Sequence, residues 1–273
     1  MESGDKPDGA SQTGGGGSAA ADPSSPQVTG QDRMVTDTKT VYTHQFPVIC
    51  VAALDNGRIA STDSLFEVHV WTPKGLEPKL EYSLIGHKAG ITAIACVGDD
   101  MVATASMDRR VRIFDLSDAA QVTDTTGYSY TPIYVTNNEA KEVTPCQTLK
   151  GHLARVSCLL FVDKFEQDER KALLISGSHD YTLKVWSRQH FDLLFTFERH
   201  EDRIATVTGL GDGKLLSSSL DNVCYIWDPL NENVFRKLNG FKYTMTNLEH
   251  VGFNLVTCTS RGGLIYNQDS SIF

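Results

Sequence analysis

Long apolar runs, paired cysteines and catalytic signatures are all missing from this chain of 273 residues. No apolar stretch approaches the roughly 20 residues that a membrane-spanning helix needs, and no charged start followed by an apolar run indicates a secretory signal. The six cysteines never lie within four residues of one another, which excludes a CxxC zinc or redox motif. HExxH and GxSxG are also absent. We therefore expect a protein of the cytoplasm, the nucleus or both, with no metal and no other cofactor.

Positive charge is also scarce, since 25 Lys and Arg residues face 34 Asp and Glu residues, a net charge of −9. Such a chain gains little from phosphate contacts, so we expect no nucleic acid and no membrane as partner. Arg109, Arg110 and Arg112 form a local basic exception. The 40 % hydrophobic content is enough for a real core.

Composition divides the chain into two parts. Residues 1–36 contain "GASQTGGGGSAAADPSSP" and have almost nothing to bury, so we expect a disordered tail, with a phosphorylation site among its serines as an alternative. From 37 to 273 short apolar runs alternate with polar residues at period two and are separated by turn residues. No helix-length pattern interrupts them, which predicts an all-β sandwich, barrel or propeller.

Internal repetition decides among those three architectures. "VATASMDRRVRIFD", "LISGSHDYTLKVW" and "LLSSSLDNVCYIWD" are three copies of one unit, and each follows a segment such as "GHKAGITAIAC" or "GHLARVSCLLF". "RIASTDSLFEVHVW" and "LVTCTSRGGLIYN" are degenerate copies. The step from histidine to aromatic is 27 residues for three copies, namely His44 to Trp71, His87 to Phe114 and His200 to Trp227.

These repeats resemble the WD-repeat family of β-propellers. The resemblance rests on the Gly-His pairs at 86–87 and 151–152, an aspartate six residues before the aromatic, and the "IWD" that ends at Asp228. It implies five blades, and the first four each have a fourth strand leading to the next repeat, in "KLEYSLIGH", "VTPCQTLKGH", "LLFTFERH" and "NVFRKLNGF". The fifth copy has no such strand of its own, and Thr38–Thr43 is expected to complete it and close the ring. An open ring, as part of a longer propeller, is the alternative.

The family's blades contain a buried polar set of histidine, serine or threonine, aspartate and tryptophan, and this pattern can be carried over to three copies. The residues are His152, Ser176, Asp180 and Trp186; His200, Ser217, Asp221 and Trp227; and His87, Thr104 and Asp108 with Phe114 in the tryptophan place. Phenylalanine has no N–H, so the set with Phe114 should stop one hydrogen bond short. The first and fifth copies have Leu65 and Arg261 in the aspartate place and are expected to lack the set.

"LISGSHDYTLKVW" raises a different possibility, because Ser176, His179 and Asp180 are residue types of a hydrolase. A catalytic triad needs members that converge from separate elements beside an oxyanion hole. These three lie on one strand and its turn, so we interpret the serine and aspartate as structural and expect no enzyme.

Partner contacts are expected on the rim that carries the histidine loops and aspartate turns, here called the top rim. Arginine and tyrosine are enriched in interface hot spots. The candidate residues are Arg155, His179, Tyr181, Arg203 and Tyr243.

Two insertions, at 116–145 and 163–172, are expected on the opposite, bottom rim. The first contains "YSYTPIYV" with Tyr128, Tyr130 and Tyr134, which suits a partner surface or an added strand. We therefore predict a non-enzymatic scaffold or adaptor that binds other proteins. A substrate-recruiting subunit of a ubiquitin ligase is the alternative, although "IWDPL" lacks the arginine two residues after Asp228 that a cullin-adaptor motif needs.

Overall fold

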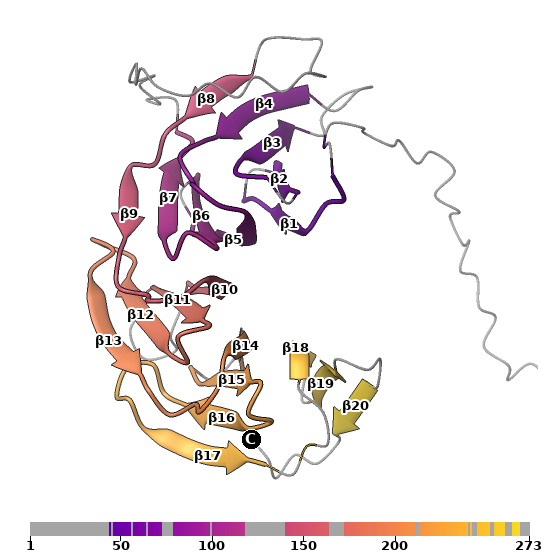
Figure 1. The fold of residues 1–273 in the computed structure, drawn as a ribbon, viewed down its shortest axis with the longest axis vertical. Helices are drawn as coiled ribbons and strands as arrows, with labels where there is room; N and C mark the ends of the chain where they lie inside the picture. Colours follow the sequence, from indigo (N-terminus) through magenta and orange to yellow (C-terminus); the bar gives the residue numbers. More distant parts are fainter. Residues whose placement is uncertain are drawn as a thin grey trace, which may run out of the picture. The chain divides into compact units, whose positions relative to one another are not determined.

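Figure 1 shows the fold of the chain in a computed structural model. The chain divides into two units, residues 1–40 and Val41–Phe273, and the described residues belong to the second. The described residues are 44–267 except 45, 56, 64, 73–78, 99, 118–139, 164–171, 211–212, 240, 242–244, 252–253 and 260–263. At Asn247 and beyond Leu248 only the backbone is described.

Five sheets follow one another along the described chain, and consecutive sheets lie side by side. The first sheet contains β1 (Cys50–Ala53), β2 (Ile59–Thr62), β3 (Val68–Thr72), β4 (Lys79–Leu84) and β8 (Lys141–Val143). The second contains β5 (Ile91–Cys96), β6 (Met101–Ser106), β7 (Val111–Asp115) and β9 (Gln147–Leu149).

The remaining sheets repeat the same up-and-down order. The third contains β10 (Val156–Val162), β11 (Leu173–Ser178), β12 (Leu183–Ser187) and β13 (Leu193–Phe197). The fourth contains β14 (Ile204–Gly209), β15 (Leu215–Ser219), β16 (Cys224–Trp227) and β17 (Val234–Leu238). The fifth contains β18 (Met245–Val251), β19 (Asn254–Thr259) and β20 (Leu264–Asn267).

This architecture confirms the predicted all-β propeller fold with five recognisable blades. The four predicted fourth strands are confirmed as β4, β9, β13 and β17. The proposed closing strand, Thr38–Thr43, lies outside the described residues, so closure of the ring stays a prediction. Among the described residues no helix is long and apolar enough to cross a membrane.

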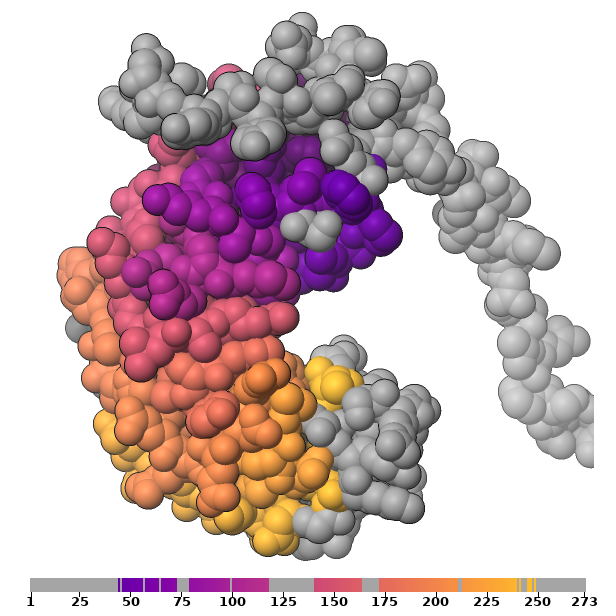
Figure 2. Space-filling model, in the orientation of Figure 1, coloured from indigo at the N-terminus to yellow at the C-terminus, as the bar shows by residue number. Residues whose placement is uncertain are grey.

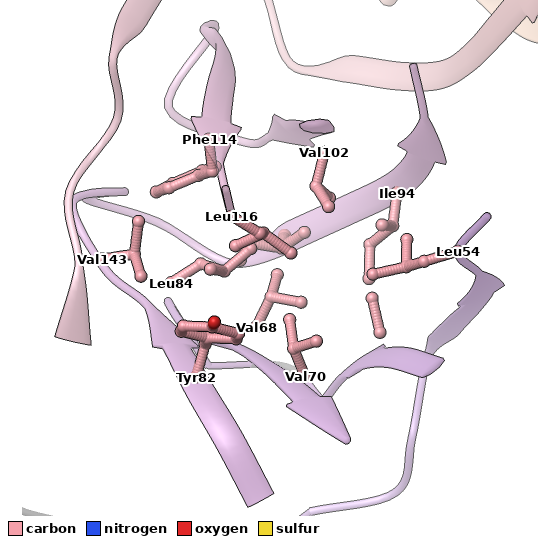
Figure 3. Close-up of a cluster of buried hydrophobic side chains, with 12 residues drawn as sticks. Leu54, Val68, Val70, Tyr82, Leu84, Ile94, Val102, Phe114, Leu116 and Val143 are labelled. Atoms are coloured by element: carbon pink, nitrogen blue, oxygen red, sulfur yellow. The ribbon is translucent and has the colours of Figure 1, made fainter. Parts of the chain in front are cut away.

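The core lies between consecutive sheets rather than within any one of them. In Figure 3, Val70, Tyr82 and Leu84 of the first sheet point toward Phe114 and Leu116, which belong to the second. Similar clusters join the second sheet to the third, the third to the fourth, and the fourth to the fifth. The described side chains of neighbouring sheets therefore form one continuous body in Figure 2.

Burial along a strand depends on the neighbouring sheet as much as on its own sequence. Val51 pairs with Ser61, as Ile94 pairs with Thr104 in the second sheet. Val51 is nevertheless 61 % exposed, whereas Ile94 is 9 % exposed. The two residues differ in burial because Ile94 lies on the face of the second sheet that packs against the first sheet.

The insertion at 116–145 yields a strand that the sequence reasoning did not place. β8 pairs in parallel with β4, with Tyr82 opposite Lys141 and Leu84 opposite Val143. The N–H of Ile85 also donates to the carbonyl of Val143 at 3.0 Å, and Val143 is buried in the first core cluster. The end of the insertion therefore extends the first sheet before the chain returns to the second sheet as β9.

The side chains of five of the six cysteines are described, and all five are free thiols. Cys224 is buried, while Cys50, Cys96 and Cys158 are half-buried. Cys146 is exposed, and its Sγ–H donates to the carbonyl of Ile113 at 3.3 Å.

Candidate functional site

The third sheet holds a hydrogen-bonded chain of four side chains beneath the top rim. His152 Nδ1 lies 2.9 Å from Asp180 Oδ2, and His152 Nε2 lies 2.8 Å from Ser176 Oγ. The indole Nε1–H of Trp186 donates to the same Ser176 oxygen at 2.9 Å. Trp186 can only donate, so the serine hydroxyl donates onward to His152, and the imidazole donates to the carboxylate. Each hydrogen bond in this series of four side chains is therefore donated in the direction of Asp180.

The charge of Asp180 is stabilised by this arrangement. Burial alone raises the pKa of the carboxyl, but the hydrogen bond and charge of His152 act against it. The Thr182 hydroxyl and the Leu153 N–H also donate to the carboxylate, at 2.7 and 2.8 Å. Together these donors hold the pKa of Asp180 well below its usual range.

The fourth sheet repeats the geometry. His200 lies 3.1 Å from Asp221 Oδ2 and 2.9 Å from Ser217 Oγ, and Trp227 Nε1–H donates to Ser217 at 3.2 Å. Burial lowers the pKa of His200, although the Asp221 carboxylate acts to raise it. Tyr225 meets the imidazole edge-on, with the ring centres 4.9 Å apart.

The second sheet replaces the tryptophan hydrogen bond with an ion pair. His87 lies 3.0 Å from Asp108 Oδ2 and 2.7 Å from Thr104 Oγ1, and Phe114 donates nothing. Arg112 Nη1 lies 2.6 Å from Asp108 Oδ2 and 2.6 Å from His87 Nδ1. Burial raises the pKa of Asp108, but the bonds from His87 and the Lys88 N–H and the Arg112 charge outweigh it and leave a strongly lowered pKa.

The expectation that the first sheet lacks the polar set is wrong. His44 Nε2 lies 2.8 Å from Ser61 Oγ, and Trp71 Nε1–H donates to that oxygen at 3.0 Å. Asp63 takes the aspartate role, with Oδ2 3.5 Å from His44 Nδ1 and Oδ1 accepting the N–H of Leu65 at 2.7 Å. Asp63 lies two residues before Leu65, which occupies the aspartate place of the other repeats. The step of ten residues from Ser61 to Trp71 is the same as in the third and fourth sheets.

The fifth sheet has no histidine at the position that corresponds to His200. Phe241, at the expected histidine place, packs against the cluster between the fourth and fifth sheets. Arg261 lies outside the described residues, and Asn267 is described by its backbone alone.

Each network also shapes the top rim, which comprises the loops after His44, His87, His152 and His200 and the turns that carry Asp63, Asp108, Asp180 and Asp221. In the third sheet the two Asp180 oxygens accept the N–H groups of Leu153 and Thr182, so that one carboxylate holds both the loop and the turn. The residue after the aspartate then adopts a positive φ, 74° at Tyr181. The same conformation occurs at Arg109 and Asn222.

The rim exposes side chains that suit contact with a protein. Leu153 is 80 % exposed and Tyr181 is 45 % exposed. Arg203 is exposed, while Arg155 and His179 are half-buried beside it. The structure thus brings together four of the five predicted top-rim residues. Tyr243 lies outside the described residues, as do Tyr128, Tyr130 and Tyr134.

Sequence reasoning missed the apolar part of this surface. Leu153, Met107 and Leu220 are all exposed at positions directly after a network histidine or directly before a network aspartate. Met107 directly precedes Asp108 and Leu220 directly precedes Asp221, so the repeat spacing by itself points to them. Ranking candidates by residue type, which favoured arginine and tyrosine, left them out of the chosen site.

The hydrogen bonds join Ser176, His152 and Asp180 in the order of a catalytic triad. Whether Ser176 could act as a nucleophile therefore depends on its exposure. Ser176 is fully buried, and its oxygen already accepts the Trp186 N–H. A nucleophile must reach a substrate carbonyl, and this buried hydroxyl is enclosed by its partners His152 and Trp186. The chain of bonds therefore fastens a loop to a turn. Among the described residues, no three His, Cys, Asp or Glu side chains are grouped to hold a metal ion.

Known proteins share these repeats. The family described as "WD domain, G-beta repeat" matches residues 78–115, 143–187 and 191–228. A ribosome biogenesis protein WDR12 homolog of Aedes aegypti is 24 % identical over 200 residues, covering 64 % of this chain and 40 % of that protein. Nuclear distribution protein PAC1-1 of Uncinocarpus reesii is 31 % identical over 112 residues, covering 38 % and 23 %. The SIR4-interacting protein SIF2 of Saccharomyces cerevisiae is 32 % identical over 98 residues, covering 36 % and 17 %.

A solved structure shows the same fold. The crystal structure of the computationally designed Ika8 protein superposes with a TM-score of 0.63 at 22 % identity, covering 82 % of this chain and 58 % of that one. This chain spans two fifths or less of the length of the curated relatives named above. Three repeat matches, four His–Asp networks and the shared fold lead to one conclusion: the chain belongs to the WD-repeat family.

Proposed function

We propose that this protein is a non-enzymatic scaffold or adaptor that binds another protein through the top rim of its second to fourth sheets. Propellers of this family generally serve as interaction scaffolds. The observation that carries the proposal is the exposed apolar side chain of Leu153 beside Tyr181, on loops fixed by the Asp180 hydrogen bonds. Rigid loops lose little conformational entropy when a partner binds.

The test compares a variant of this surface with a matched variant elsewhere. In L153E/Y181E two exposed side chains on the rim become acidic. F235E likewise makes one exposed apolar side chain acidic, at Phe235, which is 55 % exposed on the outer strand β17. Proximity labelling and pull-down with the full chain should show one set of partners lost in L153E/Y181E and retained in F235E. Equal retention in both variants would reject the top rim as the binding surface.

A second contact surface is the insertion at 116–145, as the tyrosines of "YSYTPIYV" suggest. Its test requires a deletion of residues 120–138 that leaves β8 in place, because Lys141–Val143 is part of the first sheet. Loss of a partner from this variant, with an unchanged unfolding midpoint, supports a second surface. Unchanged partners contradict it.

The proposal also includes the location of the protein in the cell. Relatives from Aedes aegypti, Culex quinquefasciatus and Trichoplax adhaerens are named ribosome biogenesis proteins, which supports a nuclear location over a purely cytoplasmic one. None of the relatives named above carries a ubiquitin-ligase name. Fluorescence microscopy of the tagged full chain, with exclusion from the nucleus as the contrary result, tests the location.

A further inference from the structure

The junction between the third and fourth sheets gathers two arginines around one histidine. Arg155 lies in the loop after His152, and its carbonyl accepts the N–H of His179 at 2.9 Å. Arg203 lies in the next loop along the chain, and its carbonyl accepts the N–H of Leu220 at 2.9 Å. Both arginines are thus attached by their backbones to the turns that follow β11 and β15.

Tight packing fixes the spacing of these groups. A Cβ at Gly177 would lie 2.6 Å from Cys158 Sγ and 2.6 Å from a methyl carbon of Ile204, so only glycine fits there. The Ser157 hydroxyl contacts the carbonyls of Gly177 and Ile204 at 3.1 and 2.8 Å. These residues lie within three positions of the cluster, so the strands next to its three members are packed tightly together.

The two arginines of this cluster have no carboxylate partner within the described part of the chain. The relevant property is pairing: neither Arg155 nor Arg203 has a side-chain ion pair or side-chain hydrogen bond with another described residue, and Arg155 Nε is buried without an acceptor. The pKa of His179 is lowered by burial first and then by the positive charges of Arg155 and Arg203, with only Asp202 acting to raise it. Asp202 Oδ1 already accepts the Arg203 N–H at 2.7 Å.

We propose that Arg155, His179 and Arg203 form a carboxylate-binding site for an extended acidic segment of the partner protein. This inference rests on the proposed function and adds the chemistry of the ligand. A buried guanidinium N–H without an acceptor is costly, and a carboxylate that binds a reoriented Arg155 relieves that cost through two parallel hydrogen bonds. Leu153 and Tyr181, on the same loop and turn, provide apolar contact for the residue beside the acidic one.

The probe is a displayed library of random peptides, selected on the full chain, followed by synthesis of the enriched peptides. The site predicts enrichment of Asp or Glu next to a large apolar residue. Binding of such a peptide should weaken about tenfold in R155Q/R203Q and about tenfold when its acidic residue becomes an amide. R109Q/R110Q is the matched control, because it removes the same charge from the rim of the second sheet and should leave affinity unchanged.

The possible outcomes separate this inference from the proposed function. If enriched peptides lack acidic residues and lose affinity in L153E/Y181E but not in R155Q/R203Q, the carboxylate site is rejected and the scaffold surface stands. If a phosphoserine replacement binds while the acidic peptide does not, the ligand is a phosphate and the inference is wrong. If the selection yields no binder, or R109Q/R110Q weakens binding equally, the site is also rejected. Equal unfolding midpoints in urea verify that each variant is folded.

Discussion

The second and third sheets perform the same structural task with different chemistry. In the third, a tryptophan N–H starts a chain of neutral hydrogen bonds that ends on Asp180. In the second, Phe114 cannot donate, and Arg112 instead contacts Asp108 directly at 2.6 Å. The position of Arg112 in the sheet corresponds to that of Lys184, whose amine donates to Thr196 at 2.9 Å.

This difference shows which part of the repeat is indispensable. Histidine, aspartate and the backbone N–H groups that join loop to turn are the same in both sheets. The aromatic donor is replaceable when a cation reaches the carboxylate. The following predictions test that replacement, in order of decreasing effect.

Replacing the network histidine should affect the two sheets unequally. His152→Ala leaves Asp180 buried without its imidazole and should lower the free energy of unfolding by about 3 kcal/mol. His87→Ala should cost less, about 1–2 kcal/mol, because Arg112 still pairs with Asp108. Urea unfolding of both variants measures this, and equal losses would show that Arg112 does not compensate.

Lowering the pH should destabilise the first sheet in particular, because His69 stands where the second sheet has Arg112. Burial, with the nearby His44, lowers the pKa of His69 to about 4, while Asp63 acts to raise it. A pKa lowered in the folded state means that the unfolded chain binds the proton first, so stability falls as pH decreases from 6.5 toward 4. His69 alone should remove about 2 kcal/mol between pH 6.5 and 5.

His69→Phe removes that titration and should flatten the pH dependence of the urea midpoint over the same window. Four further imidazoles with lowered pKa values contribute to the slope that remains, those of His44, His87, His179 and His200. A slope identical to that of the unmodified chain would contradict the assignment.

Removing the cation beside the network should distinguish Arg112 from Lys184. Arg112→Gln takes away the ion pair with a largely buried carboxylate and should cost about 2 kcal/mol. Lys184→Gln removes a single bond to Thr196 and should cost about 0.5 kcal/mol. Differential scanning calorimetry gives the comparison, and a larger loss for Lys184 would reverse the interpretation.

Loss of the aromatic donor should cost less than loss of the Arg112 ion pair. Trp186→Phe reproduces the second-sheet residue in the third sheet without its arginine, and should cost about 1 kcal/mol through the lost bond to Ser176. The double change W186F/K184R adds the guanidinium and should recover part of that loss. A full loss in the double variant would mean that the cation acts only in the second sheet.

Sequence reasoning identified the fold and three networks because they recur at one spacing. It missed Asp63 because the aspartate was sought six residues before the tryptophan, whereas the serine ten residues before it was the constant feature. It could not find β8, because a parallel partner for β4 is chosen by packing between sheets and has no local pattern. The role of Arg112 was hidden for a similar reason, since alternation predicts only which way a strand residue points.

The detour of the chain through β8 has a consequence for cooperativity. The polypeptide leaves the second sheet after β7, adds an edge to the first, and only then supplies β9 to the second. The outer strand of the second sheet therefore cannot detach without pulling on the first, while the third and fourth sheets each complete themselves from consecutive strands. Amide exchange should consequently protect the first two sheets as a single opening unit, with the third and fourth opening at separate rates.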